Sequence, residues 1–355
     1  MDYTINGHNI FFIVFITFIC SLILVPIVKK IANHIGAIDY PNERKVHKKP
    51  IPRLGGLAIF LSFMFGYVLF GQITVQMLSI LISGFVLIIV GICDDIKPLK
   101  PHVKLIGQII ASLIIVFYGN ITIPSISAFG NSIEFGVWGS ILAVIFIVAI
   151  INAINLIDGL DGLAAGTSSI FFLATSIIAF YMVRINGLDV ILSLIMLGST
   201  LGFLFYNFNP ASIFMGDTGS MFLGFMISVI ALLGYKGTTV TSLIVPIIIL
   251  LLPILDTIFA ILRRIIKGES IGSADKAHIH HQLLKLNKST RKTVLIMYGI
   301  NILCAAISIL YVLGDNRLAI ILYIVLIVIA LFLVYKTDIL FEHHKWLKHY
   351  LWYNY

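Results

Sequence analysis

Aspartates at three points of this otherwise apolar sequence are its best candidates for chemistry, and these are Asp94, Asp95, Asp158, Asp161 and Asp217. Two adjacent carboxylates repel each other and favour a nearby cation. Mg²⁺ in turn binds to one or two carboxylates together with the phosphates of a substrate. Taken alone, the acids of each segment could simply cap a helix. Together they indicate a site for a divalent cation.

The segment 152–162, NAINLIDGLDG, combines two of these acids with glycines and asparagines. A spacing of three residues predicts that Asp158 and Asp161 lie on one face of a helix. Gly159 and Gly162 would let the backbone approach a ligand closely. The segment therefore has the composition of a binding turn, and helix capping remains the structural alternative.

Two basic segments could supply the opposite charge. Residues 41–56, PNERKVHKKPIPRLGG, form the first. Such a segment beside a membrane usually sets topology and contacts anionic lipids, but it could also hold a phosphorylated substrate. The second segment, 263–281, ends in the pattern His278-Ile-His280-His281. We favour phosphate or sugar contact by these histidines over zinc binding, and a purely structural role stays open.

The elements that position these residues are predicted by the scarcity of charge. Of 355 residues, 59% are hydrophobic and 11% are charged, whereas a soluble domain is about a quarter charged. Soluble, disordered, collagen-like and disulfide-rich classes are thereby excluded. Long continuous apolar runs favour membrane helices over a barrel. We expect an all-α polytopic membrane protein with about eleven spans, at 9–29, 54–71, 74–92, 103–120, 138–156, 160–182, 187–206, 217–234, 239–262, 293–313 and 316–335.

The distribution of basic residues predicts the orientation. All Lys and Arg residues except Arg184, Lys236 and Arg317 fall on one side of these spans. The positive-inside rule then places the N-terminus outside, and the C-terminus and the acids in the cytoplasm. The net charge of +8 is explained by this bias, so no nucleic-acid partner is expected. We interpret 1–337 as one membrane domain with a retained first helix, 338–355 as an interfacial tail, and 121–137 as a short outer hairpin.

These motifs jointly resemble the polyprenyl-phosphate N-acetylhexosamine-1-phosphate transferase superfamily, glycosyltransferase family 4. The resemblance rests on Asp94-Asp95 with Lys104, on the segment 152–162, on 214–220 (FMGDTGS) and on 278–281 (HIHH), in that order. The first loop and the histidine pattern resemble the branch that uses UDP-N-acetylglucosamine (UDP-GlcNAc) and starts wall teichoic acid, O-antigen and related glycans. Pro98 departs from the family, which commonly has an acid or a lysine at that position.

The resemblance implies transfer of GlcNAc-1-phosphate from UDP-GlcNAc to undecaprenyl phosphate in the bacterial cytoplasmic membrane, with wall teichoic acid as the favoured pathway. It implies Mg²⁺, with Mn²⁺ as an alternative, held by Asp217 and Asn155. Asp94, Asp95 and Asp158 would be catalytic, with Asp94 as base or orienting group. The implied substrate contacts are Asp161, Asn207, Phe214, Lys104, Arg264, His278, His280, His281, Arg44 and His47. A covalent aspartyl intermediate and a homodimer are left open.

Three other functions compete with this hypothesis. A phospho-MurNAc-pentapeptide transferase belongs to the same superfamily, and a membrane scaffold would tolerate loss of the acids. An ion-coupled transporter would also use intramembrane acids and prolines. The positions of the acids argue against a transporter, because all except Asp256 are expected near helix ends and not in the middle of the membrane. Pro246 and Pro253 are expected to bend the ninth span and could open a groove for the lipid.

Overall fold

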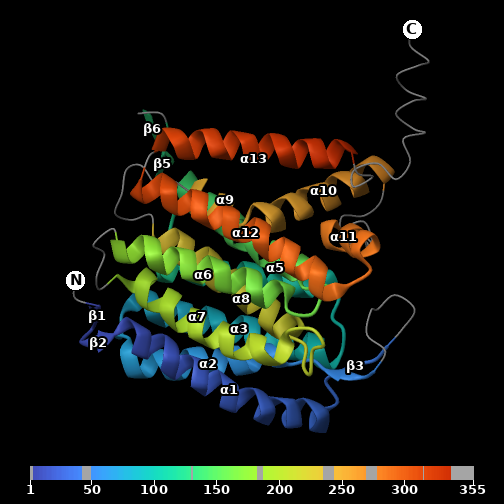
Figure 1. Cartoon of the computed structure of the whole chain (residues 1–355). Coiled ribbons are helices and arrows are strands. Elements are labelled where there is room, and N and C mark those ends of the chain that lie inside the picture. Colours follow the sequence, from blue (N-terminus) through green and yellow to red (C-terminus); the bar gives the residue numbers. More distant parts are fainter. Residues whose placement is uncertain are drawn as a thin grey trace.

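A bundle of helices that run side by side makes up the chain (Figure 1). The computed structural model describes residues 3–41, 49–128, 131–181, 187–234, 244–268, 278–314 and 316–336. The helices are α1 (Ile10–Ile35), α2 (Gly55–Phe70), α3 (Val75–Ile96), α4 (Pro101–Leu113) with a π-helical extension η1 (Ile114–Tyr118), α5 (Trp138–Ile157), α6 (Leu163–Tyr181), α7 (Leu188–Asn207), α8 (Gly216–Leu233), α9 (Ile244–Ile249), α10 (Leu251–Lys267), α11 (Ile279–Asn287), α12 (Thr290–Leu313) and α13 (Asn316–Lys336).

The helices confirm a polytopic membrane protein. Among the described residues, eight helices are long and apolar enough to cross a membrane, and they are α1, α3, α4 with η1, α5, α6, α7, α8 and α12. Helix α2 and residues Arg317–Ile329 of α13 are shorter apolar helices. The predicted number of eleven spans, and the orientation derived from the positive-inside rule, remain predictions.

Helix α8 lies in the interior of the bundle, and its first turn carries part of the predicted site. In its most apolar stretch 94% of the residues are buried, compared with 22% in α1. Glycines of α2 and α3 permit close approach to this first turn. A Cβ atom on Gly56 would lie 2.0 Å from the Gly219 nitrogen, and one on Gly91 would lie 2.4 Å from the Thr218 Cα. Small residues therefore bring α2 and α3 against the start of α8, as is typical of membrane helix interfaces.

The ninth predicted span, 239–262, is not one helix where the structure describes it. It consists of α9 and α10, which meet at Leu250 with φ −97° and ψ 19°. Pro253 has no N–H group, so it cannot donate the hydrogen bond that the carbonyl of Ile249 would receive in a continuous helix. The break at Leu250 therefore falls three residues before Pro253.

Three short antiparallel hairpins modify the all-α prediction. They are β1–β2 (Thr4–Ile5 and His8–Asn9), β3–β4 (Ile38–Asp39 and Ile51–Pro52) and β5–β6 (Ser125–Ala128 and Asn131–Glu134). The last confirms the hairpin expected within 121–137. Figure 1 shows β1–β2 and β5–β6 at one end of the bundle, and β3 at the other, on the same side as α11.

Candidate active site

The structure brings the acids of two distant segments together. Asp94 and Asp95 lie at the end of α3, and Asp217 lies in the first turn of α8. One carboxylate oxygen from each of the three lies within 4.8 Å of the others. Oxygen donors at this spacing suit a hard divalent cation. Three of the five acids that the sequence indicated as a cation site, Asp94, Asp95 and Asp217, therefore lie in one cluster, which Asp158 and Asp161 do not join.

Asp95 differs sharply from Asp94 in its surroundings. Its Oδ1 accepts a hydrogen bond from the backbone N–H of Asp217 (2.9 Å). Its Oδ2 accepts bonds from the N–H of Thr218 (3.1 Å) and from the Thr218 hydroxyl (2.6 Å). The Asp95 side chain is fully buried. Arg53 Nε donates a hydrogen bond to its Oδ1 (3.0 Å), and Nη2 of the same guanidinium forms an ion pair with Oδ1 at 2.9 Å. Asp95 thus caps α8 from a neighbouring helix, and most of its lone pairs are already used.

Two cations face the acid cluster. Lys104 Nζ lies 2.7 Å from Asp217 Oδ2 and 3.5 Å from Asp94 Oδ1. Besides Asp95, the Arg53 guanidinium faces Asp217 at 3.6 Å, Asp39 at 3.6 Å and Asp94 at 3.8 Å. Lys104 was predicted at the site, but Arg53 was not singled out. The available signal was a lone arginine in PRLGG, directly before an apolar span.

Asp158 and Asp161 do not share a helix face, which corrects the prediction from their spacing. Asp158 follows the last residue of α5 with φ −74° and ψ 41°, and Asp161 lies in the turn before α6. Gly162 has a φ of +80°, which favours glycine there and explains why the helix does not continue through this turn. The two acids are presented by a turn instead of by a helix surface.

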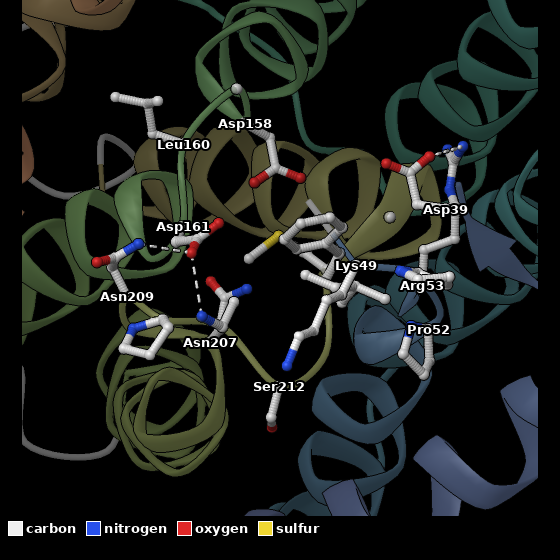
Figure 2. Close-up of a pocket in the computed structure, with 18 of the residues that line it drawn as sticks. Asp39, Lys49, Pro52, Arg53, Asp158, Leu160, Asp161, Asn207, Asn209 and Ser212 are labelled. Carbon is white, nitrogen blue, oxygen red and sulfur yellow. Dashed lines mark hydrogen bonds and ion pairs between the residues drawn. The ribbon is translucent and has the colours of Figure 1, made fainter. Parts of the chain in front are cut away.

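Asp161 and Asn207 join this turn to the loop between α7 and α8. Asp161 Oδ2 accepts hydrogen bonds from Asn209 Nδ2 (2.9 Å) and from the Ala211 N–H (3.0 Å), as drawn in Figure 2. Asn207 Oδ1 accepts a bond from the Gly162 N–H (3.1 Å), and Asn207 Nδ2 donates to the Ile213 carbonyl (3.0 Å). Both residues, which were predicted as substrate contacts, therefore also hold the turn and the loop together.

Asp158 has an altered acidity. Burial raises its pKa well above the usual value for an aspartate, and the nearby carboxylates of Asp217 and Asp95 raise it further. Its side chain points into the cavity opposite Arg53 and Asp39 (Figure 2). A carboxyl group in this environment favours either protonation or a bound cation.

A cavity of about 970 Å³ opens beside these residues. Among the predicted residues, its walls include Asn155, Asp158, Asp161, Asn207, Phe214, Asp217 and His281. Lys29, Asp39, Lys49 and Arg53, which were not among the predicted contacts, also line it. Small-molecule sites commonly measure about 300–1,000 Å³. The cavity is large enough for a nucleotide-sized ligand.

One wall of the cavity is made by backbone pairing between distant loops. The Phe214 N–H donates to the Pro52 carbonyl (2.8 Å), and the Gly55 N–H donates to the Phe214 carbonyl (2.9 Å). This pairing holds Arg53 and Phe214 side by side at the start of α2. Arg44 and His47, predicted from the same first loop, lie outside the described residues.

The three histidines occupy different positions. His281 lines the cavity, and burial together with the neighbouring His280 and His278 lowers its pKa to about 4. It is therefore neutral near pH 7 and can serve as a hydrogen-bonding group. His278 and His280 are buried next to Asp256 of α10. Arg264 is buried on α10 and is not among the residues that line the cavity.

A membrane-embedded helix bundle with clustered acids, facing cations and a polar cavity at one end defines an integral membrane protein equipped to bind a charged ligand. The model of the family "Glycosyl transferase family 4" matches residues 77–235. This region contains the Asp94, Asp158 and Asp217 segments. The chain belongs to this family, as its relatives also show.

Three relatives illustrate the similarity. The "Probable undecaprenyl-phosphate N-acetylglucosaminyl 1-phosphate transferase" of Bacillus subtilis (strain 168) is 43% identical over 333 residues, covering 93% of this chain and 92% of the relative. The "Decaprenyl-phosphate N-acetylglucosaminephosphotransferase" of Mycobacterium tuberculosis (strain H37Rv) is 34% identical over 80% of this chain and 78% of its own length. The "Undecaprenyl-phosphate alpha-N-acetylglucosaminyl 1-phosphate transferase" of Haemophilus influenzae is 34% identical over 84% of this chain and 85% of its own length.

Proposed function

We propose that this protein transfers GlcNAc-1-phosphate from UDP-GlcNAc to undecaprenyl phosphate, releasing UMP and leaving undecaprenyl-diphospho-GlcNAc in the membrane. The observation that carries the proposal is the cluster of Asp94, Asp95 and Asp217, faced by Lys104 and Arg53, beside a nucleotide-sized cavity. Acids for a divalent ion beside cations for phosphates are the parts that phosphoryl transfer requires. The names of the relatives agree with this reaction.

The donor set of the cluster fits Mg²⁺. Asp217 and Asn155 would hold the ion, with Asp94 next to them, because all three offer oxygen ligands and Asp95 is occupied by capping α8. When bound, the ion would neutralise charge on the diphosphate of the donor. Mn²⁺, which accepts similar ligands, is the alternative.

The side chains of the chain itself would supply positioning and charge. Lys104 and Arg53 already lie against the acids and can neutralise phosphate oxygens that arrive there. Asp94 would orient the lipid phosphate, which attacks the β-phosphorus of UDP-GlcNAc as UMP leaves. One phosphoanhydride replaces another, so little covalent chemistry is needed and catalysis rests mainly on alignment.

The nucleotide would occupy the part of the cavity lined by Asp161, Asn207 and Phe214. Aromatic rings stack on bases, which suits Phe214 to uracil, while the two polar residues offer hydrogen bonds. His281, neutral near pH 7, would hydrogen-bond the sugar or a phosphate oxygen. Arg264, Arg44 and His47 remain proposed contacts by resemblance.

The lipid substrate would reach the site from the membrane. Exposed apolar residues of α10, namely Ile258, Leu262, Ile265 and Ile266, offer a surface that suits lipid chains, and α10 begins at the break after α9. We propose that the isoprenoid chain approaches along this broken region. The location would be the bacterial cytoplasmic membrane, and the product would start wall teichoic acid.

A donor panel tests this function. The purified protein, with undecaprenyl phosphate and Mg²⁺, is given UDP-GlcNAc, UDP-GalNAc or UDP-MurNAc-pentapeptide in separate reactions, and UMP release is measured. We expect release with UDP-GlcNAc and far less with the others. A preference for UDP-MurNAc-pentapeptide would identify the sister activity. Inactivity with every donor would favour transport or a scaffold role.

A further inference from the structure

Asp256 has no role in the proposed chemistry, yet it is one of the most deeply buried acids of the described chain. It lies in α10, within the predicted ninth span, and its exposed fraction is 1%. An ionisable residue at this depth costs several kcal/mol unless it is paired, and such residues usually serve function. Its neighbours therefore indicate what it does.

A single carboxylate holds the start of the histidine segment. Asp256 Oδ1 accepts a hydrogen bond from the backbone N–H of Ile279 (2.8 Å), the first residue of α11. Asp256 Oδ2 lies 2.9 Å from His278 Nδ1 and 3.7 Å from His280 Nδ1. The rings of His278 and His280 are stacked, with centroids 5.5 Å apart and an angle of 11° between their planes. Asp256 thus holds the helix start and the His278 imidazole directly, and it holds the His280 imidazole through the stacking of that ring on His278.

The other side of His280 faces the acidic turn. A Cβ atom placed on Gly159 would lie 2.5 Å from His280 Nε2, so the ring packs directly on the backbone between Asp158 and Leu160. His280 is 1% exposed, and His281, the next residue, lines the cavity. A continuous set of contacts therefore runs from Asp256 through His280 to the turn that carries Asp158.

We propose that Asp256 is a positioning residue, which seats the His278-Ile-His280-His281 segment against the Asp158–Asp161 turn. This inference rests on the proposed transfer reaction. Asp256 does not touch the cavity; it acts through the two imidazoles and the start of α11. Charge is needed because a carboxylate accepts from an imidazole and from a helix N-terminus more strongly than a neutral amide does.

The first test separates turnover from donor binding. Asp256→Asn keeps the size of the side chain and removes its charge. We expect kcat to fall about 100-fold, the scale of a misplacement of about 1 Å at a reacting centre, while KM for UDP-GlcNAc changes less than about threefold. Asp189→Asn is the matched control, because Asp189 is also a buried acid but lies at the start of α7. Asp189→Asn should retain the kcat of the wild type.

A second test asks whether Asp256 acts through the histidines. In a protein that carries His278→Ala and His280→Ala, adding Asp256→Asn should lower kcat by no more than about twofold, because residues of one unit are not additive. A further 100-fold loss in that background would overturn the proposal. So would wild-type kcat in the single Asp256→Asn variant.

Gly159→Ala keeps the proposal testable if Asp256→Asn does not fold. The three atoms nearest to the added methyl carbon all belong to the His280 ring, so the substitution acts on the contact between His280 and the turn. Because Gly159 also lines the cavity, the KM for UDP-GlcNAc is measured as well and should change less than about threefold. We expect kcat to fall at least about tenfold with the protein folded. Wild-type turnover by Gly159→Ala would show that the contact between His280 and the turn is not needed, and would refute the inference. If the wild-type protein itself lacks transferase activity, the proposed function fails instead.

Discussion

At the scale of single residues, adjacent aspartates divide two tasks. Asp95 accepts two backbone N–H bonds and one hydroxyl bond at the start of α8, and it pairs with Arg53. Asp94 remains beside Lys104, with a backbone bond from Leu99. The sequence could predict the pair but not this division. Successive helical residues point about 100° apart, and which of them meets α8 depends on how α3 packs.

This division predicts opposite effects of two alanine substitutions. Asp95→Ala should lower the free energy of unfolding by at least about 2 kcal/mol, because it leaves the start of α8 uncapped and Arg53 less well paired. Asp94→Ala should abolish turnover with a much smaller loss of stability. Thermal unfolding of both purified variants, together with transferase assays, checks this. Equal losses of stability would contradict the assignment.

The raised pKa of Asp158 predicts a pH dependence of stability. Because the folded-state pKa lies above the unfolded value of about 3.9, the folded protein retains a proton that the unfolded chain loses. Stability therefore falls as pH rises from about 4 through the folded-state pKa. Asp158→Asn should remove this loss and raise the Tm of the metal-free protein more at pH 8 than at pH 4. If the Tm difference between Asp158→Asn and the wild type does not grow with pH, the raised pKa of Asp158 is contradicted.

At the scale of elements, apolar runs predicted most helices closely, and local backbone geometry and long-range pairing account for the exceptions. The fifth span was expected at 138–156 and α5 covers Trp138–Ile157. The Asp158–Asp161 turn was mistaken for helix because its spacing fits one, whereas Gly162 adopts a left-handed φ. The pairing of Phe214 with Pro52 and Arg53 joins segments about 160 residues apart in the sequence. No local sequence pattern predicts a pairing over this distance.

The break between α9 and α10 gives a prediction for one element. Pro253→Ala would restore an N–H group for the Ile249 carbonyl, so that α9 and α10 could join into one continuous helix. We expect a higher Tm, together with a higher KM for undecaprenyl phosphate, because the approach along the broken helix would close. The KM for UDP-GlcNAc serves as the internal control and should not change. An unchanged lipid KM in a stabilised variant would refute the role of the break.

At the scale of the whole molecule, the charged groups are gathered where the helix ends meet. Asp94, Asp95, Asp158 and Asp217 come from three different connections, and they converge beside one cavity. The scarcity of charge elsewhere made the acids conspicuous in the sequence. Arg53, which pairs with these acids, and Asp256, which holds the start of α11, were harder to predict, because one belongs to a basic loop and the other to an apolar span.

The most direct test of GlcNAc-1-phosphate transfer follows the β-phosphate of the donor. UDP-GlcNAc labelled with ³²P at the β-phosphorus is incubated with the protein, undecaprenyl phosphate and Mg²⁺, and lipid and water phases are separated. We predict label in the lipid fraction with release of unlabelled UMP, and loss of this transfer in Asp217→Asn. Labelled UDP in the water phase, with GlcNAc alone on the lipid, would contradict transfer of the sugar phosphate.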